Sequence, residues 1–187
     1  MKIVRVTDPE KMHEIYRFRY RIFCEEIHML DPKNYPDGEE KDEYDPFAEH
    51  FMILDDKNDI VGTFRLVLNN PLGFPGLNHM HLESLLETYD ADRLAEFSRI
   101  AIAKNHRGLR NMISLVKLLL KRGCIYLKRK KIDFVFFAVE DAFYRIIMMT
   151  RLPFKKVAGG IEYFGKERNL LIMDYNELRE KHPIFCR

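Results

Sequence analysis

The chain is poor in cysteine, has no long apolar run and carries almost no net charge, and each absence excludes a class of protein. Its three cysteines, Cys24, Cys124 and Cys186, are odd in number and far apart, which argues against a disulfide framework or a structural zinc site. No apolar run approaches the length of a membrane span. The formal net charge of +2, from 31 basic and 29 acidic residues, is smaller than a generic nucleic-acid-binding protein would carry.

The composition that remains is typical of a globular protein. Apolar residues make up 47% and charged residues 32% of the 187 residues, enough to build one sizeable core. We therefore expect a single domain over residues 1–187. The first six residues already include the charged Lys2 and Arg5, and the segment lacks the pattern of a secretory signal peptide. The expected location is the cytoplasm, with reduced cysteines, no integral membrane segment and no nucleic-acid partner.

Apolar periodicity and turn residues predict a mixed α/β fold. Helices are expected at about 9–27, 82–88, 108–130 and 141–150. Strands are expected at 2–6, 49–55, 60–69, 94–103, 133–139, 154–157, 161–164 and 168–174. A long surface loop occupies 31–47, and residues 70–80 read as a mobile segment. This order of elements favours a mixed sheet with helices on both faces.

Charged residues gather in three places where burial is expected. An acidic cluster over residues 40–45 closes the long loop, Arg65 lies inside a strand, and the motif at residues 96–99 opens another strand. Carboxylates and guanidiniums on strands of one sheet are costly to bury unless they are paired or used. Their placement predicts a built site rather than a solvated surface.

These motifs resemble, in order and spacing, those of the autoinducer (acyl-homoserine-lactone) synthase family. The related long-chain N-acyl amino acid synthases and exosortase-associated acyltransferases look similar, and all share the GNAT (N-acyltransferase) fold. The resemblance covers roughly residues 13–103, and the matching positions are Arg19, Phe23, Glu40, Asp42, Asp45, Arg65, Glu96 and Arg99. It implies a mostly antiparallel mixed sheet flanked by helices on both faces, and transfer of an acyl group to an amine.

Tryptophan is absent, and here the chain departs from the family. Autoinducer synthases typically carry a tryptophan shortly after the Phe23 position and often another just before the Glu-x-Ser-Arg motif, where this chain has His28-Met29 and Ala95. In the family these aromatics line the side of the site that takes the acyl donor and S-adenosylmethionine. Their absence argues against a homoserine-lactone product and leaves acyl transfer intact.

Amide formation from a thioester assigns roles to the matching residues. The attacking amine must lose a proton, so a carboxylate base is needed; Glu40 is the first candidate, directly or through a water, and Glu96 the second. Backbone N–H groups near Arg99–Ala101 would polarise the thioester carbonyl. The guanidiniums of Arg65 and Arg99 could each bind a carboxylate through two hydrogen bonds, either that of the acceptor or one within the site. Candidate catalytic residues are Glu40, Glu96 and Arg99, and candidate substrate-binding residues are Arg19, Phe23, Asp42, Asp45, Arg65, Ser98, Ile100 and Ala101. The alternative is that the acids and arginines form only a structural network, above all at Asp42 and Asp45.

A basic region follows the second motif. Arg107-Gly108 opens a helix as the pyrophosphate loop of GNAT enzymes does, but Arg110 and Met112 stand where that loop has small residues. Basic residues then recur at helical spacing at Arg110, Lys117, Lys121 and Lys128. A single phosphopantetheine phosphate on an acidic acyl carrier protein fits this region better than coenzyme A does. Candidate carrier-binding residues are Arg107, Gly108, Arg110, Lys117 and Lys121; the alternative is a solvated basic face.

Two further features have weaker support. Tyr144 lies in a predicted helix where some GNAT enzymes place a general acid. The pair His79 and His81 and the acidic run over residues 37–42 lack the ligand spacing of a metal site, so no metal is expected.

The sequence as a whole predicts an N-acyltransferase that moves a fatty acyl group from an acyl carrier protein or coenzyme A thioester to a small amine, of the N-acyl amino acid synthase type. No cofactor is implied beyond this acyl donor. The alternatives are an acyl-homoserine-lactone synthase that uses S-adenosylmethionine, a coenzyme A-dependent acetyltransferase, and a non-catalytic acyl-carrier-binding module.

Overall fold

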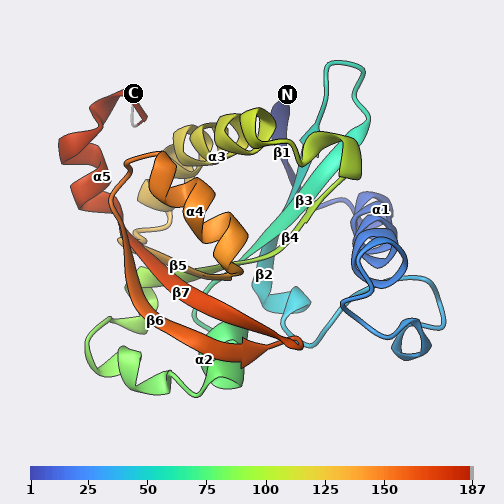
Figure 1. Cartoon of the computed structure of the whole chain (residues 1–187), viewed down its shortest axis with the longest axis horizontal. Helices are drawn as coiled ribbons and strands as arrows, with labels where there is room; N and C mark the ends of the chain where they lie inside the picture. The colour runs from blue at the N-terminus through green and yellow to red at the C-terminus, as the bar shows by residue number, and fades with distance from the viewer. Residues whose placement is uncertain (186–187) are drawn as a thin grey trace. The chain divides into compact units, whose positions relative to one another are not determined.

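The computed structural model describes residues 1–185, which form a mixed α/β fold (Figure 1). The strands are β1 Lys2–Val6, β2 Ala48–Leu54, β3 Ile60–Val67, β4 Leu94–Ile102, β5 Phe134–Val139, β6 Phe154–Tyr163 and β7 Lys166–Asp174. The α-helices are α1 Pro9–Tyr20, α2 Pro75–Met80, α3 Leu109–Arg129, α4 Asp141–Met149 and α5 Tyr175–Lys181. The strand order is β1-β2-β3-β4-β5-β7-β6, with β4 and β5 parallel and the pairs β1–β2, β2–β3, β5–β7 and β6–β7 antiparallel. The predicted mostly antiparallel mixed sheet is confirmed.

The chain divides into two compact units, and the division falls within β4. Unit 1 comprises Met1–Val67 and Phe97–Arg107, and unit 2 comprises Leu68–Glu96 and the chain from Gly108 onward. The ladder between β4 and β5 covers Leu94–Glu96 and so belongs to unit 2. Each unit is described in turn.

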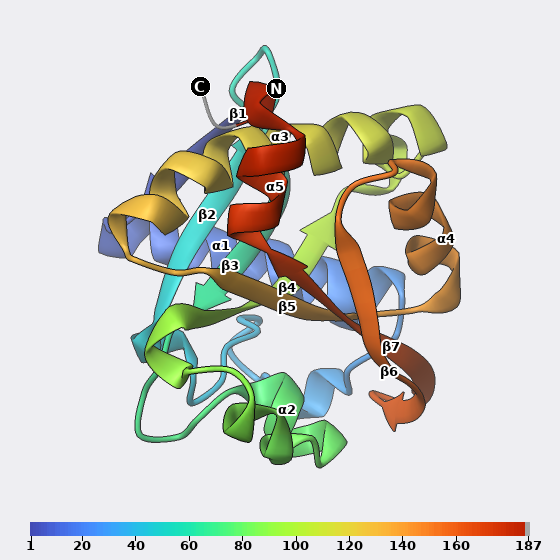
Figure 2. The ribbon, with the colours of Figure 1, turned by 90° about the vertical axis from the view of Figure 1, so that its left-hand side faces the viewer.

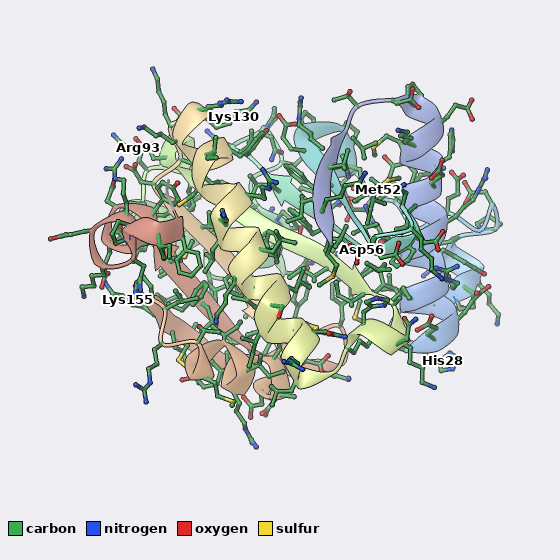
Figure 3. The ribbon with its side chains drawn as sticks, turned by 90° about the horizontal axis from the view of Figure 1, so that it is seen from above. His28, Met52, Asp56, Arg93, Lys130 and Lys155 are labelled. Atoms are coloured by element: carbon green, nitrogen blue, oxygen red, sulfur yellow. The ribbon has the colours of Figure 1, made fainter. Side chains whose placement is uncertain are left out.

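Unit 1 is an antiparallel meander with one helix packed on it. Val6 of β1, Ile15 of α1 and Met52 of β2 form a buried cluster. Met52 is labelled in Figure 3. Helix α1 begins as expected, with Asp8 accepting a hydrogen bond from the Lys11 N–H at 3.1 Å and proline in the first turn. It ends at Tyr20 and continues as a π-helix over Arg21–Glu26, so the predicted helix is right in extent but not in its last turns. Short π-helical segments are uncommon and often lie at functional sites.

Gly62 allows β4 to approach β3 closely inside unit 1. A Cβ at this position would lie 2.7 Å from Ile102 Cδ1 and 3.1 Å from the Ala101 carbonyl oxygen. Any side chain there would push the two strands apart, so the glycine fixes where the second half of β4 lies.

Unit 2 contains β5, β7 and β6 in that order (Figure 2). Helix α3, expected at 108–130, buries one apolar face, made of Met112, Leu115, Val116, Leu120, Cys124 and Leu127. Lys130 caps its C-terminal end (Figure 3). The helix therefore has the amphipathic pattern of a surface helix that packs on a core.

Several predictions about local structure were wrong. Residues 154–157 and 161–164 are one strand, β6, because two bulges near Ala158 and Gly160, the latter at φ +70°, bend it without ending it. The segment at 70–80 contains α2, which proline starts at its first position. The short helix expected at 82–88 is present as a 3₁₀-helix over Glu83–Glu87, whereas α5 was missed.

The cysteines differ in their state. Cys24 is free and buried, whereas Cys124 is disulfide-bonded, so the expectation of fully reduced cysteines is wrong for that residue. Cys186 lies outside the described residues. Among residues 1–185, no helix combines the length and the apolar composition needed to cross a bilayer.

Candidate active site

Unit 1 buries a closed ring of alternating charges. Each member is hydrogen-bonded to both of its neighbours, and the order around the ring is Arg19, Glu40, Arg99, Asp42, Arg65 and Asp45. Three guanidiniums thus face three carboxylates. All six positions were predicted site residues, and the structure brings them together.

Arg19 and Arg99 hold Glu40 between them. Arg19, near the end of α1, donates its Nε–H to one Glu40 oxygen, and Arg99 donates its Nε–H to the other at 2.9 Å. Glu40 is fully buried, and its backbone N–H donates to the Tyr16 carbonyl at 3.1 Å. Each Glu40 oxygen therefore already accepts a charge-assisted hydrogen bond.

Arg65 of β3 occupies the opposite side of the ring. Its two Nη groups grip Asp42 as a fork, with Nη2 to Oδ2 at 2.8 Å, and Nη1 also reaches Asp45 Oδ1 at 2.7 Å. Arg19 donates to both Asp45 oxygens, at 2.8 and 3.2 Å. Ser98 accepts the remaining Arg65 Nε–H at 3.0 Å, so the arginine has no unsatisfied side.

Burial makes the charge balance of this ring essential. The relative exposure of Arg19 is 1%, of Arg65 0% and of Asp45 5%. Burial by itself raises the pKa of Asp45, but the charges of Arg19 and Arg65 and their hydrogen bonds outweigh it and hold that pKa well below its usual range. The pKa of Asp42 is lowered against burial in the same way, by Arg65 and Arg99. Asp42 and Asp45 are therefore carboxylates at neutral pH, and the ring sets three acidic side chains against three guanidiniums.

The local backbone explains how neighbouring residues serve one cluster. Successive residues of a strand point to opposite faces, yet both Ser98 and Arg99 reach the ring. Arg99 has φ +51°, in the left-handed region that non-glycine residues rarely adopt, and this breaks the alternation within β4. Such strain in a non-glycine residue is typical of functional sites.

An apolar cluster lies in the same unit as the ring. Phe23 and Ala101, two predicted substrate-binding residues, are packed together with Phe18 and Ile22. Met29, which stands where the autoinducer synthases carry tryptophan, packs against this cluster. Ile100 is half-buried in β4. Unit 1 therefore contains both a charged ring and a buried apolar cluster.

Glu96 belongs to unit 2 and has a different environment. It is 3% exposed and accepts a hydrogen bond from the Gly76 N–H at 2.7 Å, at the N-terminus of α2. A Cβ on Gly76 would meet this carboxylate at 3.1–3.2 Å. The sequence analysis missed Gly76, although Pro75-Gly76 is a recognisable helix start.

The predicted carrier-binding residues fall into two groups. Arg107 of unit 1 is held in place, because its Nε–H donates to the Ile102 carbonyl and its Nη2 pairs with Glu26, both at 2.7 Å. In unit 2, Gly108 caps α3, and Arg110, Lys117 and Lys121 are exposed along that helix. No ion pair within residues 1–185 involves these last three cations, so their charge faces solvent.

Tyr144 lies half-buried in α4, with the Lys156 ammonium 5.6 Å from its ring centre. Its role as a general acid stays a prediction. His50 was not singled out from the sequence; it is buried beside Asp45, and no motif around it gave a signal.

Comparison with known proteins places this geometry in a family. The acetyltransferase (GNAT) domain model matches residues 18–117. No curated protein is similar enough in sequence to match.

Solved structures share the fold at low sequence identity. TofI, in a ternary complex with an inhibitor and MTA, matches at 18% identity with a TM-score of 0.74 over 100% of both chains. BjaI, a CoA-dependent acyl-homoserine lactone synthase with SAM and isopentyl-CoA, matches at 20% identity with a TM-score of 0.68, over 95% of this chain and 83% of its own. FeeM, an N-acyl amino acid synthase from uncultured soil microbes, matches at 14% identity with a TM-score of 0.67, over 98% and 96%. These likenesses confirm the predicted GNAT-like fold.

The family model covers more than half of the chain and includes all six members of the charged ring. The chain therefore belongs to the acetyltransferase (GNAT) domain family and is an acyltransferase.

Proposed function

We propose that this protein transfers a fatty acyl group from an acyl carrier protein or coenzyme A thioester to the amine of a small amino-acid-like acceptor, as one domain over residues 1–187. The observation that carries the proposal is the balanced ring of three arginines and three carboxylates in unit 1. An amino acid is a zwitterion, so it can exchange its own two charges for one ion pair of the ring without leaving a charge unbalanced.

The accessible part of the ring suggests where the acceptor binds. Asp42 and Arg99 have side-chain exposures of 15% and 9%, and they pair with each other at 2.7 Å. The other four members are almost fully enclosed. In the proposal, the acceptor carboxylate binds Arg99 and its amine binds Asp42, while the enclosed members fix both side chains in place.

The acyl chain and the thioester have their own candidates. In the proposal, methylene groups of the acyl chain pack against Met29 and Leu30, which are partly buried beside the apolar cluster around Phe23 and Ala101. The backbone N–H groups of Ile100 and Ala101 would polarise the thioester carbonyl. Glu40 and Glu96 remain the candidate bases; Glu40 already bridges two arginines and Glu96 already binds Gly76, so in either case a water relays the amine proton.

The proposed donor is an acyl carrier protein or coenzyme A. An acidic carrier protein would meet the exposed Arg110, Lys117 and Lys121 of α3, and Gly108 with Arg107 would meet the phosphate of the pantetheine arm. BjaI is described with isopentyl-CoA, and this supports keeping coenzyme A as the alternative donor. Because both donors are made in the cytoplasm, the proposal places the reaction there.

An acyl-homoserine-lactone synthase is the second candidate, since BjaI is described with SAM. Met29 in place of an aromatic residue beside Phe23 disfavours it, because a thioether stacks less well on a planar adenine ring. A coenzyme A-dependent acetyltransferase and a non-catalytic acyl-carrier-binding module are the remaining alternatives.

The experiment is mass spectrometry of organic extracts from cells that express the wild type, Arg99→Lys, Glu40→Gln or Asp37→Asn. A wild-type series of N-acyl amino acids, lost in Arg99→Lys, supports the proposal and names the acceptor. Asp37→Asn is the matched control. Asp37 lies in the same loop, but within residues 1–185 it pairs only with exposed Lys41 and with the Glu39 backbone N–H. A lactone series would select the second candidate. Carrier binding without any product, in a folded protein, would select the binding module.

A further inference from the structure

His50 of β2 contacts Asp45 of the charged ring, and the two side chains form an ion pair only when the imidazole is protonated. It is 5% exposed and lies opposite Arg65 of β3 and Val6 of β1 in the strand registers. Its Nε2 atom is 3.0 Å from the backbone carbonyl of Asp45 and 3.8 Å from Asp45 Oδ1. The imidazole thus contacts Asp45 through both its backbone and its carboxylate.

The contact with the carbonyl determines the tautomer. A carbonyl oxygen can only accept, so Nε2 carries the hydrogen and donates it. In the neutral imidazole, Nδ1 is then a bare lone pair. Nδ1 is buried and has no hydrogen-bond partner among residues 1–185. A second proton would therefore create a buried N–H donor that has no acceptor.

The charges around His50 oppose that proton. Tyr16 and Arg19 face it from α1, Asp45 from the turn before β2, and Arg65 from β3, while β1 contributes only Val6. The ring already contains three cations and three anions, so an imidazolium would be an unbalanced fourth cation. Burial is the main effect that lowers the pKa of His50, with Arg19 and Arg65 adding to it and Asp45 opposing it.

One atom connects this histidine to the rest of the ring. Asp45 Oδ1 accepts from Arg19 Nη1 at 2.8 Å and from Arg65 Nη1 at 2.7 Å, and it is the atom that lies 3.8 Å from His50 Nε2. A protonated imidazole would attract Oδ1 and compete with both arginines for it.

We propose that His50 is a positioning residue of the acceptor site: its neutral Nε2–H tautomer holds Asp45 in the ring, and its protonation opens the ring. The link to the acceptor rests on the proposed function, whereas the link to the ring rests on the contacts of Asp45 alone. His50 makes acceptor binding sensitive to pH in a range where Asp42 and Asp45 stay ionised.

The pH window follows from the direction of the shift. Because the pKa of His50 is lower in the folded protein than its unfolded value of about 6.5, the folded state binds fewer protons. The stabilisation is complete above the unfolded value and is lost as the pH falls toward the folded one. Asp42 and Asp45, whose pKa values are also lowered, lose their stabilising effect only below about pH 4.

The test combines a tautomer measurement with two substitutions in the full chain. Long-range ¹H–¹⁵N NMR of the imidazoles should show His50 as the Nε2–H tautomer at pH 7, and its titration gives the neutral fraction at each pH. His50→Gln keeps an amide N–H for the Asp45 carbonyl but does not titrate, whereas His50→Phe removes the donor. His13→Gln is the matched control, because His13 pairs with Glu39 outside the ring.

We expect the ratio of the wild-type KM to the His50→Gln KM for the amine to rise as the pH falls. The rise should be in inverse proportion to the neutral fraction of His50, and kcat should be less affected. His50→Phe should raise this KM at every pH, and His13→Gln should behave as wild type. If no acyl transfer is found, the thermal midpoints of wild type and His50→Gln are compared across the same pH range instead. Their difference should follow the neutral fraction of His50, so the test does not depend on the proposed function. An Nδ1–H tautomer, or the same acid dependence in wild type and His50→Gln, would overturn the proposal.

Discussion

The two units place basic side chains in opposite environments. In unit 1, Arg19, Arg65 and Arg99 each bind two carboxylates, and Arg19 and Arg65 are almost completely buried. In unit 2, the basic residues of α3 are exposed. Unit 1 has 16 acidic and 13 basic residues and unit 2 has 13 acidic and 18 basic, so the small net charge of the chain hides this division.

The difference teaches that a charge must be interpreted through its partners. A guanidinium with two buried carboxylate partners cannot be removed without leaving an unbalanced charge, so it fixes a structure and a site together. An exposed cation without a partner adds little to stability and remains available to an anionic partner. The four predictions below test this contrast, from the largest expected effect to the smallest.

Arg65→Met should have the largest effect on stability. It leaves Asp42 and Asp45 without their shared guanidinium, and removing one partner of a buried ion pair typically costs about 3–5 kcal/mol. Urea unfolding measures the change. Arg110→Met in unit 2 is the control and should stay within about 0.5 kcal/mol of wild type, because Arg110 is exposed. Equal effects of the two substitutions would show that the ring does not stabilise unit 1.

Gly62→Ala should destabilise the protein, and Gly123→Ala should stabilise it. The new methyl group at 62 would overlap Ile102 and approach the Ala101 carbonyl, a cost of about 1–3 kcal/mol. At 123, in α3, a Cβ has only Leu127 near it at 3.9 Å, and alanine is the better helix former by about 0.8–1 kcal/mol. The pair is compared by urea unfolding. If Gly62→Ala were neutral, the close approach of β3 and β4 would not be a constraint.

Acid should weaken the ring through Asp45. The folded-state pKa of Asp45 lies below its ordinary value, so the stability it provides is present above about pH 4 and is lost as the pH falls further. Asp45→Asn should be less stable than wild type at pH 7 and should lose less stability between pH 4 and pH 2. Thermal midpoints across this range measure it, with Glu10→Gln, an exposed carboxylate of α1, as the control. Parallel curves for Asp45→Asn and wild type would remove Asp45 from the account.

Substitution of the exposed cations should change stability least. Lys117→Gln with Lys121→Gln should leave urea unfolding within about 0.5 kcal/mol of wild type but weaken binding of acyl carrier protein, with a reduced dependence on salt. Calorimetric titration with the carrier protein measures the affinity. Lys33→Gln with Lys57→Gln, two exposed lysines of unit 1, is the matched control. Carrier affinity unaffected by the α3 pair would mean that this face is simply solvated.

Much of this arrangement could be predicted from the sequence, because local signals were strong. Apolar periodicity located α3, β5 and α4 closely. The charged motifs contain five members of the ring, and the resemblance to the autoinducer synthase family added Arg19. Burial of charge on strands was enough to predict a built site in which these groups are either paired or used.

Other features depended on information that no local pattern carries. The bulges that join the two halves of β6, and the left-handed Arg99 in β4, are backbone choices that the sheet imposes. Glu96 could not be assigned to Gly76, because the contact links β4 with a short helix that was taken for a loop. His50 gave no signal, since a histidine in an alternating strand is defined only by its three-dimensional neighbours.

The most direct test of the central claim is an assay of the purified protein. It is given a long-chain acyl carrier protein thioester or the matching coenzyme A thioester, together with a mixture of amino acids or with S-adenosylmethionine, and the products are identified by mass spectrometry. The account predicts an N-acyl amino acid that forms with wild type and is lost with Arg99→Lys while the fold is kept. An intact thioester with every acceptor, or equal product from wild type and Arg99→Lys, would contradict it.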